Sequence, residues 1–257
     1  MKEWITGRNP VYEVLSASRR HVYQLLINQT ASLKGRLADI VRLCTSRHIP
    51  IVEASQQQLD EIYNNHQGVA LATSAYPYSS TIEIIDRISE PGQTPLLLLL
   101  DALQDPQNLG TLLRTAEGVG VHGIFLPLRK TAKITPAVVN ASSGASEHLL
   151  ITQVNLAQTI GLLKKEGIWV IGLEDIPQAQ APDQVRLDGP IALVVGSEGQ
   201  GMRPLVRKSC DILMSLPMRG KIDSLNAAVA GSIALYLVWQ RRGYSGIQIP
   251  GPAIDDY

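Results

Sequence analysis

Five apolar runs recur in the second part of the chain, and none of them alternates with polar residues. They lie at residues 96–100, 123–126, 168–173, 191–195 and 212–216. Segments with the apolar spacing of helices lie between or after them, at 108–118, 135–143, 156–166 and 224–241. A strand that is apolar on both faces is typical of a parallel sheet covered by helices on both sides. This part is therefore predicted to be an α/β domain with a mostly parallel sheet.

The first 75 residues predict a smaller α/β domain. Asn9 and Pro10 are typical of a helix start, and further helices are expected over 31–47 and 55–63. Strands are expected at 22–27, 49–52 and 68–73. Residues 76–95 turn polar and contain Pro and Gly, with a modest helix signal at 81–88, so we interpret them as the connection between domains. The second domain would span 96–245, followed by a Pro- and Gly-rich tail over 246–257.

Composition narrows the class of protein. The chain has 257 residues, and its 23 Lys and Arg balance 23 Asp and Glu, which argues against binding nucleic acid by bulk positive charge alone. No apolar run reaches the roughly 20 residues of a membrane span, and the N-terminal segment lacks the hydrophobic part of a signal peptide. Cys44 and Cys210 stand alone, so neither a zinc site nor a disulfide framework is expected. We expect a cytoplasmic protein.

Three loops after predicted strands contain the candidate chemistry. Open parallel sheets bind ligands at the carboxyl ends of their strands. The loops that follow 96–100, 191–195 and 212–216 read DALQDPQNLGTLLRTAEGVG, GSEGQGM and PMRGKIDSLNAAVA. Each combines Gly, Pro or Asn with one or two polar side chains, which lets the backbone approach a ligand closely.

Gly118, Gly120 and Gly123 form a G-x-G-x-x-G pattern, which would suggest a nicotinamide-dependent oxidoreductase. Such a site requires the pattern to follow a strand and open a helix, whereas here it ends a predicted helix and leads into a strand. A helix C-cap and a tight turn explain it. The loop 196–202 also lacks the Lys-Ser/Thr of a phosphate loop. Its low charge suits an adenine or a sulfonium-bearing amino acid better than a triphosphate.

Each polar candidate also has a purely structural interpretation. Asn108 could cap the helix that contains Arg114, which projects about 120° away from it and could be a surface cation. Ser224 and Asn226 could cap the last helix. Glu198 could be a solvated residue of a glycine-rich turn.

Taken together, the three loops resemble the three motifs of the SpoU (TrmH-like) RNA 2′-O-ribose methyltransferases of the SPOUT superfamily. DPQNLGTLLRTA, GSEGQGM and LPMRGKIDSLNAAVA occur in the family's order, with KITPAVVNASSGASEHL as a further family-like stretch, and the likeness covers residues 96–242. In the first 75 residues, GRNPVYEVLSA and HQGVALAT resemble the L30e-like substrate-binding domain of the subgroup that methylates a guanosine of large-subunit (23S) rRNA.

The resemblance implies a fold, a cofactor and a reaction. The expected fold is an L30e-like α/β domain followed by a SPOUT α/β-knot domain, whose C-terminal part threads into a trefoil knot. S-adenosylmethionine is expected in the knot, and no metal ion is implied. The methyl group would pass to a ribose 2′-hydroxyl. The residues expected to hold the cofactor are Gly196, Glu198, Gly199, Gly201, Leu216, Pro217, Met218, Ser224, Leu225, Asn226 and Ala227.

The family's catalytic arginine corresponds to Arg114. A guanidinium stays protonated at neutral pH, so its expected role is to bind the hydroxyl and stabilise developing negative charge. A phosphate, water or a transiently neutral guanidine could take the proton. Asn108, Glu198, Ser224 and Asn226 correspond to the other polar motif positions and are expected to orient Arg114, the ribose and the cofactor.

The resemblance also implies a homodimer in which one subunit helps complete the partner's site. The apolar stretch 227–239 is a candidate interface, with intramolecular core as the alternative. Methyl transfer to tRNA and a catalytically silent RNA-binding protein are the alternative functions; intact Arg114, Glu198 and Asn226 argue against the latter. Candidate RNA contacts are Arg8, Arg19, Arg20, Arg129, Lys130, Arg219 and Lys221.

Overall fold

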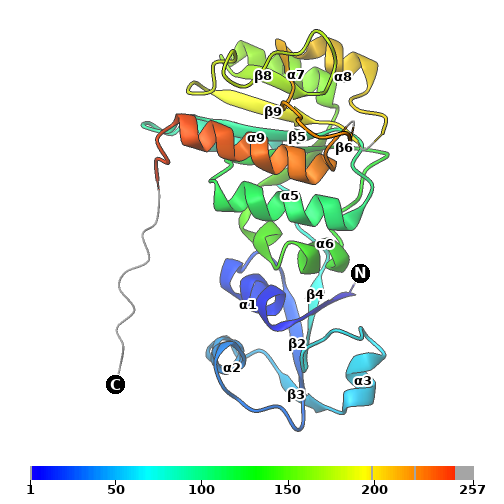
Figure 1. Cartoon of the computed structure of the whole chain (residues 1–257). Helices are drawn as coiled ribbons and strands as arrows, with labels where there is room; N and C mark the ends of the chain where they lie inside the picture. The colour runs from blue at the N-terminus through cyan, green and yellow to red at the C-terminus, as the bar shows by residue number, and fades with distance from the viewer. Residues whose placement is uncertain (1, 198, 223, 247–257) are drawn as a thin grey trace, which may run out of the picture.

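Two sheets organise the residues that the computed structural model describes, which are 2–197, 199–222 and 224–246. The smaller sheet has the strand order β1-β4-β2-β3 and lies at one end of the molecule (Figure 1). β2 and β3 are parallel, whereas β4 pairs antiparallel with β1 and β2. Its strands are β1 (Lys2–Thr6), β2 (Val22–Asn28), β3 (Ile51–Ala54) and β4 (Val69–Ser74). Its helices are α1 (Arg8–Ala17), α2 (Arg36–Ser46) and α3 (Gln56–Asp60).

The larger sheet is wholly parallel and has the order β10-β8-β9-β5-β6-β7. Its strands are β5 (Leu96–Leu100), β6 (Gly123–Pro127), β7 (Ile151–Val154), β8 (Trp169–Leu173), β9 (Ile191–Val195) and β10 (Ile212–Met214). The predicted fold class, a small α/β domain followed by an α/β domain with a mostly parallel sheet, is confirmed. The strands β1 and β7 were not predicted. Both lie at a sheet edge and include polar residues, so neither forms an apolar run.

Helices cover both faces of this sheet, which explains why its strands lack polar alternation. In β5, Leu96, Leu98 and Leu100 belong to the cluster that includes α5 and α9. Leu97 and Leu99 belong to the cluster on the opposite face, with α4, α7 and α8. The helices are α4 (Thr81–Ile88), α5 (Pro106–Gly118), α6 (Pro136–Ala141), the 3-10 helix η1 (Ala145–His148), α7 (Leu156–Lys165), α8 (Pro204–Ser209) and α9 (Ala227–Arg241).

Local capping sets helix starts that differ from the predicted ones. α5 begins at Pro106 because the Asp105 carboxylate accepts hydrogen bonds from the backbone N–H groups of Gln107 (3.1 Å) and Asn108 (3.2 Å). Asn108 is therefore a first-turn residue rather than the cap. Asn226 does cap α9, which begins three residues later than predicted. In the first domain, α1 follows Gly7 and α2 follows Gly35, so α2 is shorter than the predicted 31–47.

The G-x-G-x-x-G pattern is the end of α5 and the start of β6, as the C-cap interpretation predicted. Gly120 has φ 73°, and its N–H donates to Glu117 O while Val121 N–H donates to Ala116 O, the two bonds of a Schellman motif. A glycine is required at position 123 for a different reason, which is close packing. A Cβ there would lie 2.3 Å from Ile84 Cγ2, so the missing side chain admits α4 against the sheet. Residues 81–88 of the connection thus pack on the second domain.

One hydrophobic cluster runs through both domains. It includes Ile5, Val11 and Leu15 from the first domain together with Val138 and Leu149 from the second. α1 and β1 contact η1 and α6, which lie on the face of the large sheet that α5 also covers (Figure 1). The two domains are therefore packed together rather than merely tethered. Within the described residues, no helix is both long and apolar enough to cross a bilayer.

Candidate functional site

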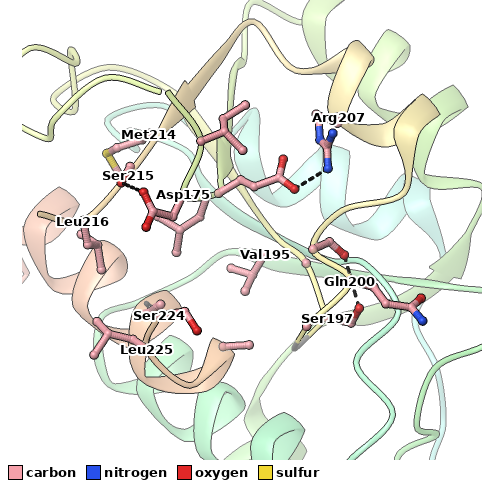
Figure 2. A pocket seen from close by; sticks show the side chains of 18 of the residues that line it. Asp175, Val195, Ser197, Gln200, Arg207, Met214, Ser215, Leu216, Ser224 and Leu225 are labelled. Atoms are coloured by element: carbon pink, nitrogen blue, oxygen red, sulfur yellow. Dashed lines mark hydrogen bonds and ion pairs between the residues drawn. The ribbon is translucent and has the colours of Figure 1, made fainter. Parts of the chain in front are cut away.

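A pocket of about 440 Å³ lies at the carboxyl ends of β8, β9 and β10 (Figure 2). Leu216, Ser224 and Leu225 lie along one side, and Ser197 and Gln200 lie on the opposite side. Pro217 and Asn226 do not line the pocket, and Glu198 lies outside the described residues. The expected cofactor residues that do line it are Gly196, Gly199, Gly201, Leu216, Met218, Ser224, Leu225 and Ala227.

Another side of the pocket was not predicted from the sequence. Glu174 and Asp175 follow β8, and Arg207 lies on α8. Arg207 Nη2 donates to Glu174 Oε1 at 2.5 Å, and Ser215 Oγ donates to Asp175 at 2.8 Å. The rule applied to the other three loops, that polar residues directly after a parallel strand lie at the ligand-binding edge, would have identified Glu174 and Asp175. Leu173 pairs with Val195, so β8 ends beside β9 and the residues after β8 lie at the same edge of the sheet.

Two features of the pocket fit S-adenosylmethionine. A Cβ at Gly196 would lie 2.4 Å from the Gly201 carbonyl carbon and 2.5 Å from Met202 N, so only glycine lets the loop fold back over the strand end. The second feature is Glu174 Oε2, which is buried and has no hydrogen-bond partner among the described residues. It can accept a hydrogen bond from ribose hydroxyls or an ammonium group, and its charge favours a cationic sulfonium nearby.

Replacing Gly196 by Ala is expected to weaken S-adenosylmethionine binding about tenfold or more. The added Cβ would overlap backbone, and overpacking of this kind costs about 1–3 kcal/mol. Titration calorimetry of the purified variant measures the change in Kd. The control is Gly161→Ala, because a Cβ at that exposed helical position meets open space. Equal affinity of the two variants would remove Gly196 from the cofactor site.

The first and third sequence motifs meet at a pair of asparagines. Asn226 Nδ2 donates to Asn108 Oδ1 at 3.0 Å, while Asn226 Oδ1 caps α9 by accepting from the N–H groups of Ala228 (2.9 Å) and Val229 (3.2 Å). Farther along the same two helices, Thr115 Oγ1 and Ser232 Oγ are 2.9 Å apart. α5 and α9 therefore hold the two motifs side by side.

Arg114 lies apart from the cofactor pocket. Its side chain leaves the exposed face of α5, and Nη1 donates to Ser143 Oγ at 3.1 Å. It lines a second cavity of about 440 Å³, which we call the interdomain groove. No residue of this groove lines the cofactor pocket. The groove is lined by Asn9, Glu13, Arg36, Arg114, Glu117, Ser142, Ser143, Ala145 and His148.

Two of the candidate RNA contacts are structural instead. Arg20 is 6% exposed and binds Glu147 and Glu3, and Arg19 donates to the backbone carbonyls of Leu149 (2.6 Å) and Pro77 (3.1 Å). Both arginines therefore join the domains rather than face solvent. Arg8, which is half-buried, donates Nε to Gln67 O at 3.1 Å. The remaining candidates, Arg129, Lys130, Arg219 and Lys221, are exposed.

The cysteines offer no ready nucleophile. Burial raises the pKa of the Cys44 thiol to about 11 and that of Cys210 to about 12, so both are protonated at neutral pH. Among the described residues, no three His, Cys, Asp or Glu side chains are grouped as a metal site would need.

Known proteins match both domains. Residues 95–236 match the SpoU rRNA Methylase family, and residues 4–79 match the family described as RNA 2′-O ribose methyltransferase substrate binding. YacO of Bacillus subtilis (strain 168), assigned to the TrmH family of tRNA/rRNA methyltransferases, is 39% identical over 249 residues, which are 95% of this chain and 98% of YacO.

Two solved structures show the extent of the shared fold. The SpoU methyltransferase AviRb from Streptomyces viridochromogenes, in complex with AdoMet (S-adenosylmethionine), has a TM-score of 0.77 at 22% identity and covers 95% of this chain and 91% of its own. The TrmH/SpoU tRNA modifying enzyme of A. aeolicus has a TM-score of 0.54 at 28% identity, and covers 60% of this chain and 78% of its own. The family match spans more than half of this chain and YacO is similar along nearly all of it. The chain therefore belongs to the SpoU (TrmH) family, as an S-adenosylmethionine-dependent RNA 2′-O-ribose methyltransferase with the family's substrate-binding domain.

Proposed function

We propose that the methyl acceptor is the 2′-hydroxyl of a guanosine in large-subunit rRNA. The observation that supports this target is the first domain, which matches the substrate-binding family over residues 4–79 and resembles the domain of the rRNA-directed subgroup. The A. aeolicus tRNA modifying enzyme covers 60% of this chain, against 95% for the methyltransferase AviRb. This domain packs directly on the catalytic one.

S-adenosylmethionine supplies an electrophilic methyl group bound to a sulfonium. The ribose 2′-hydroxyl that would accept this methyl group must give up its proton, to a phosphate, water or a transiently neutral guanidine, so negative charge develops on its oxygen. In the proposed mechanism the Arg114 guanidinium binds this oxygen and stabilises the charge. Ser143 accepts one of the guanidinium hydrogen bonds, which fixes its direction and leaves its other N–H groups for the substrate.

The cofactor would be held mainly by backbone. The proposed contacts are the backbone of residues 196–201, 216–218 and 224–227, with Gly196, Leu216 and Leu225 as the principal positions. Glu174 and Asp175, which follow β8, add two carboxylates to the lining of the pocket. Asn108 and Asn226 hold the two helix starts together, and Ser224 lines the pocket. For Glu198, the proposed orienting role rests on its motif position alone.

We further propose that the active enzyme is a homodimer. Arg114 lines the interdomain groove and not the cofactor pocket of its own chain, which favours a second copy whose cofactor pocket faces it. α9 packs on α5 through one side and leaves apolar side chains exposed on another. A helix that is apolar all round is usually buried, and a second copy would cover it. The exposed apolar residues on α9 are Val229, Ile233 and Tyr236, and those that flank it are Ile222, Leu225 and Tyr244.

Removal of the gene is expected to abolish one 2′-O-methylguanosine in large-subunit rRNA. Mass mapping of ribose methylation in total RNA, with and without the gene, measures this. Complementation with the wild-type gene should restore the mark, and complementation with an Arg114→Ala gene should not. Loss of a tRNA mark instead would retain the chemistry and reject the rRNA target. No lost mark in either RNA would favour a silent RNA-binding protein.

A further inference from the structure

The interdomain groove has one wall from each domain. Asn9 and Glu13 lie on α1, and Arg36 is the first residue of α2, so these three come from the substrate-binding domain. Arg114 and Glu117 lie on α5 of the catalytic domain. The rest of the lining, which we call the floor, is formed by Ser142, Ser143, Ala145 and His148. The volume, about 440 Å³, is within the range of roughly 300–1,000 Å³ that small-ligand sites occupy.

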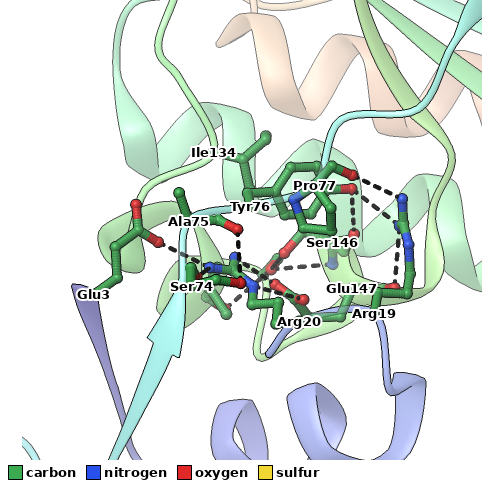
Figure 3. Close-up of polar contacts among 12 residues, drawn as sticks. Glu3, Arg19, Arg20, Ser74, Ala75, Tyr76, Pro77, Ile134, Ser146 and Glu147 are labelled. Carbon is green, nitrogen blue, oxygen red and sulfur yellow. Dashed lines mark hydrogen bonds and ion pairs between the residues drawn. The ribbon is translucent and has the colours of Figure 1, made fainter. Parts of the chain in front are cut away.

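The two walls are held in a fixed relation by buried ionic and backbone contacts (Figure 3). Arg20 donates to both carboxylate oxygens of Glu147, at 2.8 and 3.0 Å, and the two side chains are 0% and 1% exposed. Arg19 adds hydrogen bonds to the carbonyls of Leu149 and Glu147. A bidentate pair of this kind fixes orientation as well as distance. The groove is therefore built before any ligand arrives.

The floor of the groove also requires close contact between the domains. Gly144 has φ 89°, and a Cβ there would lie 2.5 Å from Glu13 Cβ, so only glycine allows α1 to approach this closely. His148 Nε2 lies 2.8 Å from Glu13 Oε2, so the Glu13 carboxylate already has a partner. Ser143, between these contacts and α5, accepts the hydrogen bond from Arg114.

Two guanidinium groups in the groove have no carboxylate partner among the described residues. Arg36 lies over the Tyr12 ring, 4.0 Å from its centroid, and Arg114 is bonded to the neutral Ser143. Neither forms an ion pair with any residue that the structure describes. A guanidinium stacked on an aromatic ring keeps its edge N–H groups available, and their fork matches a phosphate. Two such forks can each bind a phosphate oxygen pair, while the carboxylates of Glu13 and Glu117 in the same groove balance their positive charge.

We propose that the interdomain groove binds the acceptor nucleotide of the RNA, with Arg114 at its ribose and Arg36 on an adjacent phosphate. Asn9 supplies an amide beside them that can hydrogen-bond to the ribose or the base. The substrate-binding domain then contributes side chains to the acceptor site itself, besides any contacts it makes with distant RNA. This inference rests on the proposed function, because Arg114 defines which end of the groove receives the ribose.

The test uses the full-length protein and large-subunit rRNA purified from cells that lack the gene. Arg36→Gln is expected to weaken binding of this RNA about tenfold and to reduce the slope of log Kd against log salt by about 0.7–0.9, as loss of one phosphate contact would. The affinity for S-adenosylmethionine should stay unchanged. The matched control is Arg42→Gln, because Arg42 lies on the same helix, pairs with Asp39 and does not line the groove.

Equal RNA affinity and equal salt slopes for Arg36→Gln, Arg42→Gln and wild type would overturn the groove proposal. Asn9→Ala gives an independent measurement, since the proposal expects a raised KM for RNA. Failure of the proposed function has a different result: wild-type protein that binds this RNA would transfer no methyl group to it. In that case the comparison of Arg36 with Arg42 still decides whether the groove binds RNA.

Discussion

Replacing Arg114 by Ala is expected to reduce the rate of methyl transfer about a thousandfold while leaving the affinity for S-adenosylmethionine unchanged. The proposed guanidinium stabilises charge that develops only in the transition state, and removing one such donor typically costs about 10²–10³ in kcat. Cofactor binding should persist because Arg114 does not line the cofactor pocket. Single-turnover methyl transfer and titration calorimetry measure the two quantities separately.

The control for this variant is Arg186→Ala, which removes an arginine that is 81% exposed and outside both cavities. Near-normal turnover of Arg114→Ala would reject the catalytic assignment.

The same variant tests whether the active enzyme is a dimer. At an S-adenosylmethionine concentration too low to fill the Gly196→Ala pocket, mixing the two variants should restore about a quarter of wild-type activity if Arg114 serves the partner's pocket, since half of the dimers would then contain one intact site. No recovery on mixing would place both groups in one subunit.

Replacing Glu147 by Ala is expected to lower the free energy of unfolding by about 3–5 kcal/mol. Arg20 would remain buried between the domains with only Glu3 as a charged partner, and its Nε and Nη2 groups would lose the carboxylate that accepts their hydrogen bonds, which is costly in a buried site. Burial alone would lower the pKa of Arg20, but its bonds to Glu147 and Glu3 outweigh this and raise it. The guanidinium is therefore charged in the folded protein. Urea unfolding followed by circular dichroism measures the loss.

Two further variants show whether the effect comes from burial. Asp188→Ala breaks the exposed pair with Arg186 and should leave the free energy of unfolding close to that of the wild type. Glu147→Gln keeps the shape and one acceptor oxygen, so its loss should fall between the two. A cost for Glu147→Ala as small as that for Asp188→Ala would mean that this ion pair does not hold the domains together.

Most of the large sheet could be predicted because its central strands are apolar on both faces. β5, with five consecutive leucines, illustrates this. The pattern fails at the edge, where β7 includes Thr152 and Gln153 and has a neighbour on one side only. The predicted knot came from family resemblance, since periodicity reports faces and not the path of the chain.

The candidate site could be predicted where glycine and asparagine mark a loop, and not where a site is assembled from distant segments. Gly196 and Leu216 reach one pocket as expected. The sequence cannot distinguish a buried arginine from an exposed one, because the partner of Arg20 lies 127 residues away. Arg19 and Arg20 were therefore predicted as RNA contacts. For the same reason, no pattern placed Asn9 and Arg36 beside Arg114.

The Arg20–Glu147 pair limits how the two domains can be exchanged or inherited. A chimaera that joins the first domain of a relative to this catalytic domain at residue 76 would separate the two charges into different parents. A graft made that way keeps the buried pair only if the donor also supplies an arginine at position 20. A crossover beyond residue 149 would instead keep Arg19, Arg20 and their partners Glu147 and Leu149 in one parent.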